Sequence, residues 1–292
     1  MRSSRSELLR KTASSGTCAT CTSHCVTTEV APAKVRTRQF VFATYAFTWI
    51  PMLTLIGLGA DVRQGPAQSV FALSACGPTL MAAVMWLAHP RERRAYRRPV
   101  WPAIPLGLLL GAAVPCLPAL VLHMNDLSAL SLSSSAALAD AGGLLGFVGL
   151  TLLAGPLAEE FGWRGYLQPR IRRNHGVAAA SLIIGLVWAI WHLPLFFLHG
   201  TGQHAAGLLS IRAVALLAGL IPFSLVMLFL VERLRGGVPA AVAAHFGFNG
   251  GDSVVPRPGV VGTLLELGVL LLIALGAALL CMRDRRRTSP SA

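Results

Sequence analysis

The sequence predicts an all-α, polytopic membrane protein with about eight transmembrane helices. Hydrophobic residues make up 54% of the 292 residues and charged residues only 13%, whereas soluble domains carry about 25% charged residues. The mean hydropathy is +0.63, and long apolar stretches recur along the whole chain. The Lys and Arg residues also concentrate in alternate connections, as the topology of a membrane protein requires.

The first three predicted spans cover residues 40–60, 67–89 and 100–123. Each is an uncharged apolar run, and each meets the requirement of about 20 residues for a helix that crosses a bilayer. A Ser- and Ala-rich loop at 124–141 follows them, and we expect it to contain a short helix.

The fourth, fifth and sixth spans are predicted at residues 142–163, 177–198 and 211–231. The fifth and sixth resemble the first three in length and composition, but the fourth contains two adjacent glutamates. A charged side chain at the centre of a membrane helix costs about 2.5–3.5 kcal/mol on insertion scales, so the fourth span is a functional candidate.

The seventh span, residues 238–250, is short, and the eighth, residues 260–282, is a long apolar run. Glycine pairs flank the seventh span at 236–237 and 250–251. About 13 residues give roughly 20 Å of helix, too little to cross the bilayer alone. We therefore expect this helix to end beside a polar cavity between the fourth, fifth and seventh helices, because exposed backbone is tolerated only where protein covers it.

The formal charge of +13 reflects topology rather than nucleic-acid binding. With the N-terminus in the cytoplasm, 22 of the 25 Lys and Arg residues fall on the inner side. This pattern predicts that both termini are cytoplasmic and that the basic residues contact lipid. We expect a multi-pass protein of a bacterial plasma membrane that has no nucleic-acid partner.

The composition divides the chain into three parts. Residues 1–39 are a basic segment that we predict to be disordered, 40–282 form the transmembrane domain, and 283–292 form a basic cytoplasmic tail. Cys18, Cys21 and Cys25 have the spacing of metal ligands, but the segment lacks a second half-site, so we favour a disordered tail.

The two glutamates of the fourth span differ in their expected partners. Glu160 and Arg164 are i and i+4 neighbours and can neutralise each other. Glu159 lies about 100° further round the helix and has no partner within the segment. We therefore interpret Glu159 as a free general base and the Glu160–Arg164 pair as supporting structure.

Two further spans contribute polar residues. Trp188 and His192 share one face of the fifth span, and His245 and Asn249 share one face of the seventh. Each group would be costly alone in lipid, so we expect them to meet Glu159 at one point. Straight helices would nevertheless separate Glu159 from His192 by roughly 15 Å in depth.

This set of groups suits the hydrolysis of an acyl bond. Glu159 would take a proton from water, and His245 with Asn249 would donate hydrogen bonds to the developing oxyanion. His192 would position the water. Alternatively, Glu159, His192 and His245 would bind Zn²⁺ or another divalent metal that activates the water. The residues alone do not decide between these mechanisms.

The motifs resemble those of the CAAX protease and bacteriocin-processing family of intramembrane proteases. Its Glu-Glu-x-x-x-Arg motif reads here from Glu159 to Arg164. An aromatic-x-x-x-His motif reads from Trp188 to His192, and His-x-x-x-Asn reads from His245 to Asn249. The order of the family is kept, and the resemblance covers about residues 143–250. Trp188 replaces the commoner phenylalanine.

The resemblance implies an intramembrane endopeptidase, with Glu159 activating water, His192 assisting, and His245 and Asn249 forming the oxyanion site. It also implies a lipidated or membrane-anchored peptide substrate. Both CAAX-type trimming, as in type II CAAX prenyl endopeptidases, and bacteriocin processing remain open. The alternative is a non-enzymatic transporter or a bacteriocin self-immunity protein that uses the same polar groups.

Overall fold

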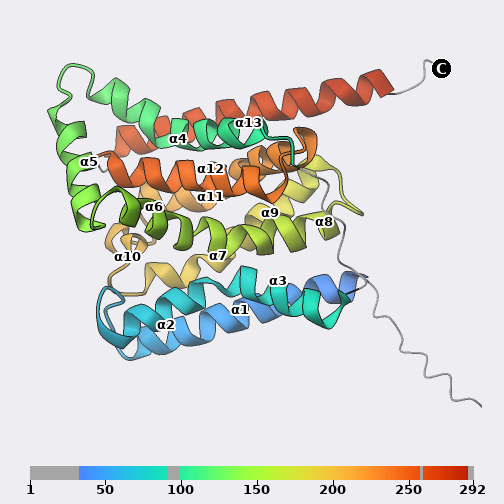
Figure 1. The fold of residues 1–292 in the computed structure, drawn as a ribbon, viewed down its shortest axis with the longest axis horizontal. Coiled ribbons are helices and arrows are strands. Elements are labelled where there is room, and N and C mark those ends of the chain that lie inside the picture. The colour runs from blue at the N-terminus through green and yellow to red at the C-terminus, as the bar shows by residue number, and fades with distance from the viewer. Residues whose placement is uncertain (1–32, 91–98, 257–258, 289–292) are drawn as a thin grey trace, which may run out of the picture. The chain divides into compact units, whose positions relative to one another are not determined.

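The structure, a computed structural model, describes residues 33–90, 99–256 and 259–288 (Figure 1). Within these ranges the chain forms helices joined by turns, without a β-strand, so the all-α prediction is confirmed. The cysteine cluster at 18–25, the connection at 91–98 and the last four residues lie outside the described part of the chain.

The helices have the following bounds, with η2 and η4 in π-helical and η3 in 3₁₀-helical geometry: α1 Ala33–Gly57, α2 Gly65–Ala75, α3 Gly77–Ala88, α4 Ala103–Leu122, α5 Ser128–Asp140, α6 Leu144–Leu153, α7 Pro156–Glu160, η2 Phe161–Leu167, α8 Gln168–Ile171, α9 Val177–Trp191, η3 Leu193–Phe196, α10 Gly202–Ala206, α11 Ile211–Leu228, η4 Phe229–Arg233, α12 Gly237–Val254 and α13 Val260–Thr288.

Six helical stretches of the described chain are long and apolar enough to cross a membrane. The bent pair α2–α3, with an angle of 51°, raises the number to seven if it forms one span. The protein is therefore an integral membrane protein, but the predicted number of eight spans is not confirmed. The helix that does not qualify is α12, whose apolar face is interrupted by His245, Asn249 and Asp252.

Several helix ends differ from the predicted boundaries. α1 already begins at Ala33 rather than at residue 40, and α13 continues to Thr288, beyond the predicted end at 282. α12 has 18 residues, not 13, so it is about 27 Å long at 1.5 Å per residue. The glycine pair Gly250–Gly251 lies inside α12 and does not end it. The sequence predicts a helix end at this pair, but Gly251 packs closely against Pro115 and Cys116 of α4.

The glycines of α12 and α4 allow these two helices to approach closely. A Cβ atom added to Gly111 of α4 would lie 1.9 Å from the carbonyl oxygen of Ala244, and one added to Gly247 of α12 would lie 2.3 Å from that of Leu108. Small residues at such contacts bring the two backbones together, which is how membrane helices gain packing energy without a hydrophobic driving force. This contact fixes the position of α12, which carries His245.

Gly111→Ala is expected to destabilise the protein by about 1–3 kcal/mol, because the added methyl group overpacks the α4–α12 contact. Thermal unfolding in detergent measures the effect. Gly276→Ala is the matched control, since its Cβ would meet no atom within 4 Å. Equal melting temperatures for the two variants would contradict the packing role of Gly111.

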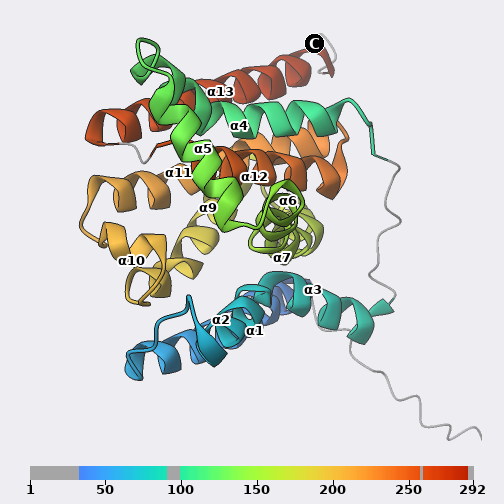
Figure 2. The same cartoon turned by 60° about the vertical axis from the view of Figure 1, so that its left-hand side comes forward.

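In both views α4 and α13 lie on one side of the helices and α1–α3 lie on the other, with α7 and α12 between them (Figures 1 and 2). The inner face of α3 contacts the fourth span directly. Thr79 donates a hydrogen bond of 2.8 Å to the carbonyl oxygen of Leu157. A Cβ on Gly162 would lie 2.4 Å from the carbonyl oxygen of Pro78. α3 therefore supports the segment that carries both glutamates.

Candidate active site

The glutamates lie where the fourth span changes its helical geometry. α6 ends at Leu153, Gly155 is extended with φ −168° and ψ −72°, and α7 begins at Pro156. Proline has no N–H to donate to the carbonyl of Leu152, so the break follows from the sequence. The π-helix η2 then begins at Phe161. π-helical turns are rare and frequently lie at functional sites.

Glu159 is buried, with 6% of its surface exposed, and its carboxylate is held by two tryptophans. The indole Nε1 of Trp188 donates a hydrogen bond of 2.6 Å to Oε2, and Nε1 of Trp163 donates one of 3.2 Å to the same oxygen. The prediction that Glu159 has no partner within its segment is therefore wrong, because Trp163 lies only four residues further along. The prediction considered only oppositely charged partners, and the indole N–H of Trp163 is a neutral donor.

Glu160 is completely buried and contacts two other site residues. Its Oε2 lies 3.4 Å from Nε of Arg164, so the predicted ion pair is confirmed. Its Oε1 lies 2.8 Å from Nδ1 of His245 on α12, a contact that the sequence analysis did not predict. An ionised carboxylate can only accept at this contact, and Nδ1 of His245 then carries the proton. The guanidinium of Arg164 also stacks over the ring of Trp188, 4.5 Å from its centroid.

His192 lies at the end of α9, where Pro194 interrupts the helix and η3 begins. Its Nδ1 is 2.8 Å from the carbonyl oxygen of Trp188. A carbonyl oxygen can only accept, so Nδ1 is the protonated nitrogen, and Nε2 of the neutral ring retains its lone pair.

Asn249 and the free edge of His245 face the break in the fourth span. A Cβ atom added to Gly155 would lie 2.7 Å from Nδ2 of Asn249 and 3.2 Å from Nε2 of His245. A side chain at position 155 would therefore displace one or both of these nitrogens. Among the described residues, the side-chain amide of Asn249 makes no hydrogen bond with protein, so its N–H groups are available to a ligand.

The structure corrects the expected difference in depth between Glu159 and His192. Both residues hydrogen-bond to Trp188, one to its indole and the other to its carbonyl group. The fourth span continues from Leu144 to Ile171, well beyond the predicted end at 163. Glu159 therefore lies near the middle of the span Leu144–Ile171, not near its C-terminal end, and it reaches the last turn of α9 through its bond to Trp188.

The three predicted metal ligands, Glu159, His192 and His245, do not form a ligand set in the structure. The part of the chain that the structure describes contains no group of three or more His, Cys, Asp or Glu residues placed to hold an ion. Glu159 is bonded to two indoles, and Nδ1 of His245 is bonded to Glu160. These bonds use only one oxygen of Glu159 and one nitrogen of His245, so metal binding by these residues stays a prediction.

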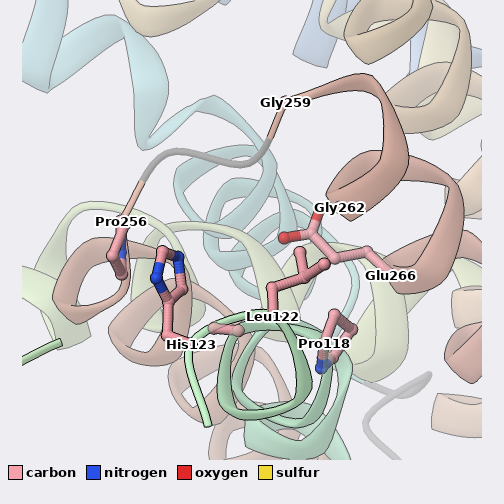
Figure 3. A pocket seen from close by; sticks show the side chains of 8 residues that line it. Pro118, Leu122, His123, Pro256, Gly259, Gly262 and Glu266 are labelled. Atoms are coloured by element: carbon pink, nitrogen blue, oxygen red, sulfur yellow. The ribbon is translucent and has the colours of Figure 1, made fainter. Parts of the chain in front are cut away.

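The sequence analysis missed a second acid within an apolar span. Glu266 of α13 and His123, at the end of α4, line a separate cavity of about 50 Å³ (Figure 3). The ion pair of Arg212 and Asp252, 3.2 Å apart, acts electrostatically on Glu266. The signal was an acid in an otherwise apolar run. None of the candidate catalytic residues lines this cavity.

Comparisons with known proteins support the resemblance seen in the motifs. Residues 141–251 match a family model described as "Type II CAAX prenyl endopeptidase Rce1-like". A protein of Methanococcus maripaludis named "CAAX prenyl protease 2" is 27% identical over 124 residues, which are 42% of this chain and 45% of that protein. The chain thus spans less than half the length of this relative. The resemblance to the CAAX protease family is therefore confirmed for residues 141–251, the segment that contains all three motifs.

Proposed function

We propose that this chain is an intramembrane endopeptidase that cleaves a peptide bond close to a lipid anchor, as the name of its relative suggests. The observation that carries the proposal is the convergence of three spans on Trp188. Its ring contacts His245 at a centroid distance of 5.5 Å and His192 at 6.0 Å, and its indole bonds Glu159. The match to a CAAX prenyl endopeptidase family adds independent support.

Glu159 and His192 would activate the water. The indoles occupy only Oε2 of Glu159, and among the described residues Oε1 makes no hydrogen bond. Oε1 is then available to take a proton from water. Nε2 of His192 has a lone pair that accepts the second hydrogen of the same water, because Nδ1 donates to the carbonyl of Trp188. Two acceptors would thus orient the oxygen of the water for attack on the scissile carbonyl.

His245 and Asn249 would stabilise the negative oxygen that forms on the attacked carbonyl. Nδ2 of Asn249 donates as it stands. Nε2 of His245 donates only if the ring carries both protons, since Glu160 accepts from Nδ1. Donors already in place where charge develops lower the barrier without reorganisation.

The Glu160–Arg164 pair would supply the charge balance for this arrangement. With His245 protonated, the two carboxylates of Glu159 and Glu160 face two cations, Arg164 and His245, and the buried cluster is neutral. A neutral cluster avoids the large desolvation cost of an unpaired buried charge. Glu160 would also fix the orientation of the His245 ring, as carboxylates do for catalytic imidazoles.

The test is cleavage of a synthetic peptide by the purified full-length chain in lipid vesicles. The peptide has a prenylated cysteine three residues before its C-terminus, and the control peptide lacks the prenyl group. We expect release of the last three residues from the prenylated peptide and at least about tenfold slower cleavage of the control, because the lipid brings the substrate to the site. Assays with and without a chelator show whether a metal takes part.

Each other outcome has a clear meaning. Cleavage of both peptides at one rate would contradict a lipid-anchored substrate. Passage of peptide across vesicles without cleavage would support the transporter alternative. A separate experiment, accessibility labelling of the two chain ends, tests the proposal that both lie on the cytoplasmic side.

A further inference from the structure

The hydrogen bonds that the carboxylate of Glu159 accepts come from neutral donors, not from a cation. Trp188 and Trp163 are both buried, with 1% and 0% of their surfaces exposed. Both indoles donate to the same oxygen, Oε2. Within the described ranges Glu159 makes no ion pair, because Arg164 and His245 both contact Glu160 instead. The two indoles are therefore the polar groups that offset the burial of this carboxylate.

Neutral donors have a chemical consequence that a cation would not have. A cation at bonding distance would hold the carboxylate by charge and reduce its ability to take a proton. Hydrogen bonds from two indoles hold Oε2 and leave Oε1 without a protein partner. The bond from Trp188, at 2.6 Å, is the shorter of the two, and bonds to an ionised acceptor are shorter than bonds between neutral groups.

Trp188 also contacts the other groups of the site. Its carbonyl oxygen accepts from Nδ1 of His192 at 2.8 Å. Its ring lies under the guanidinium of Arg164 and edge-on to His245. Trp188 thus contacts both Glu159 and His192, the two residues that would share the water, and links their orientations.

We infer that Trp188, with support from Trp163, is a positioning residue that orients Glu159 for proton transfer through its indole N–H. The inference rests on the proposed function. It does not require Trp188 to touch the substrate. A phenylalanine at this position would retain the ring contacts with Arg164 and His245 and the backbone bond to His192, and it would lose only the N–H donor.

Steady-state kinetics on the prenylated peptide test this inference with matched variants. Trp188→Phe is expected to lower kcat by about 10- to 100-fold, the range for a hydrogen bond to a charged group, while KM stays near the wild-type value. Trp163→Phe should have a smaller effect, because its bond to Oε2 is longer. The control is Trp191→Phe, which removes a buried indole N–H that donates to Oγ1 of Thr48 at 3.1 Å and not to Glu159.

A spectroscopic measurement addresses the hydrogen bond without activity. In the full chain labelled with ¹⁵N-tryptophan, the indole proton of Trp188 should resonate downfield of that of Trp191, because it is bonded to a carboxylate. Glu159→Gln should move the Trp188 signal upfield and leave the Trp191 signal in place. An unchanged Trp188 signal would overturn the inference even if a Trp188 variant failed to fold.

The outcomes separate this inference from the proposed function. If the wild type does not cleave, or Glu159→Gln cleaves normally, the proposed function fails. If the wild type cleaves, Glu159→Gln does not, and the double variant of Trp163 and Trp188 retains the wild-type kcat, only the positioning role fails. A rise in KM alone for Trp188→Phe would also overturn it, since it would indicate a role in binding.

Discussion

Glu159→Gln is expected to lower kcat for the prenylated peptide by about 10²- to 10⁴-fold, the contribution typical of a general base. The amide has the size of the carboxylate, and its oxygen can still accept from the two indoles. It cannot take a proton from water, so the chemical step loses its base while the fold persists. The measurement is kcat in vesicles, together with the melting temperature in detergent.

Glu266→Gln is the matched control, because it makes the same substitution at another acid within a membrane-spanning helix. Glu266 lines the separate cavity beside α4 and α13. Its variant should cleave at the wild-type rate. Normal cleavage by Glu159→Gln, or equal losses in both variants, would contradict the assignment of Glu159 as the base.

Asn249→Ala is expected to lower kcat by about 10²- to 10³-fold, the effect of removing one oxyanion donor. The amide nitrogen of Asn249 lies against the backbone of Gly155, beside Nε2 of His245. Alanine removes the donor and introduces neither a charge nor a larger side chain, so KM should change little. Kinetics on the prenylated peptide, with the melting temperature as a measure of folding, check this expectation.

Ser253→Ala is the matched control on the same helix. The hydroxyl of Ser253 donates a hydrogen bond of 2.7 Å to the backbone carbonyl oxygen of Asn249. Its removal leaves the side-chain amide of Asn249 in place. The control should retain the wild-type kcat. If Asn249→Ala raises KM and preserves kcat, the residue binds the substrate in the ground state and does not stabilise the oxyanion.

The positions of the polar residues could be predicted because their cost in an apolar helix is visible locally. Glu159, His192 and His245 each interrupt a long hydrophobic run, which is rare without a function. The contact between Glu160 and Arg164 was predictable for a similar reason, since i and i+4 neighbours meet on any α-helix.

The predicted ends of the helices were less accurate, because glycine has two opposite uses. The sequence analysis interpreted Gly250–Gly251 as the end of the seventh helix, yet α12 continues to Val254. In this helix Gly251 lies against α4, where it leaves room for Pro115 and Cys116, and Gly250 faces Phe147 and Thr151 of α6. A glycine can end a helix or allow another helix to pack closely against it. Which of the two occurs depends on the neighbouring helix, and the local sequence does not reveal that neighbour.

The sequence by itself determined that the chain is helical and apolar, and it identified which polar groups stand on the fourth, fifth and seventh predicted spans. Only the tertiary structure decided which groups meet: Glu160 bonds His245, 85 positions away, and Glu159 bonds Trp188, 29 positions away. Periodicity relates residues on one helix, whereas these contacts depend on a glycine break, a π-helical turn and the close approach of α4 and α12. The orientation of the Glu159 side chain therefore follows from helix packing.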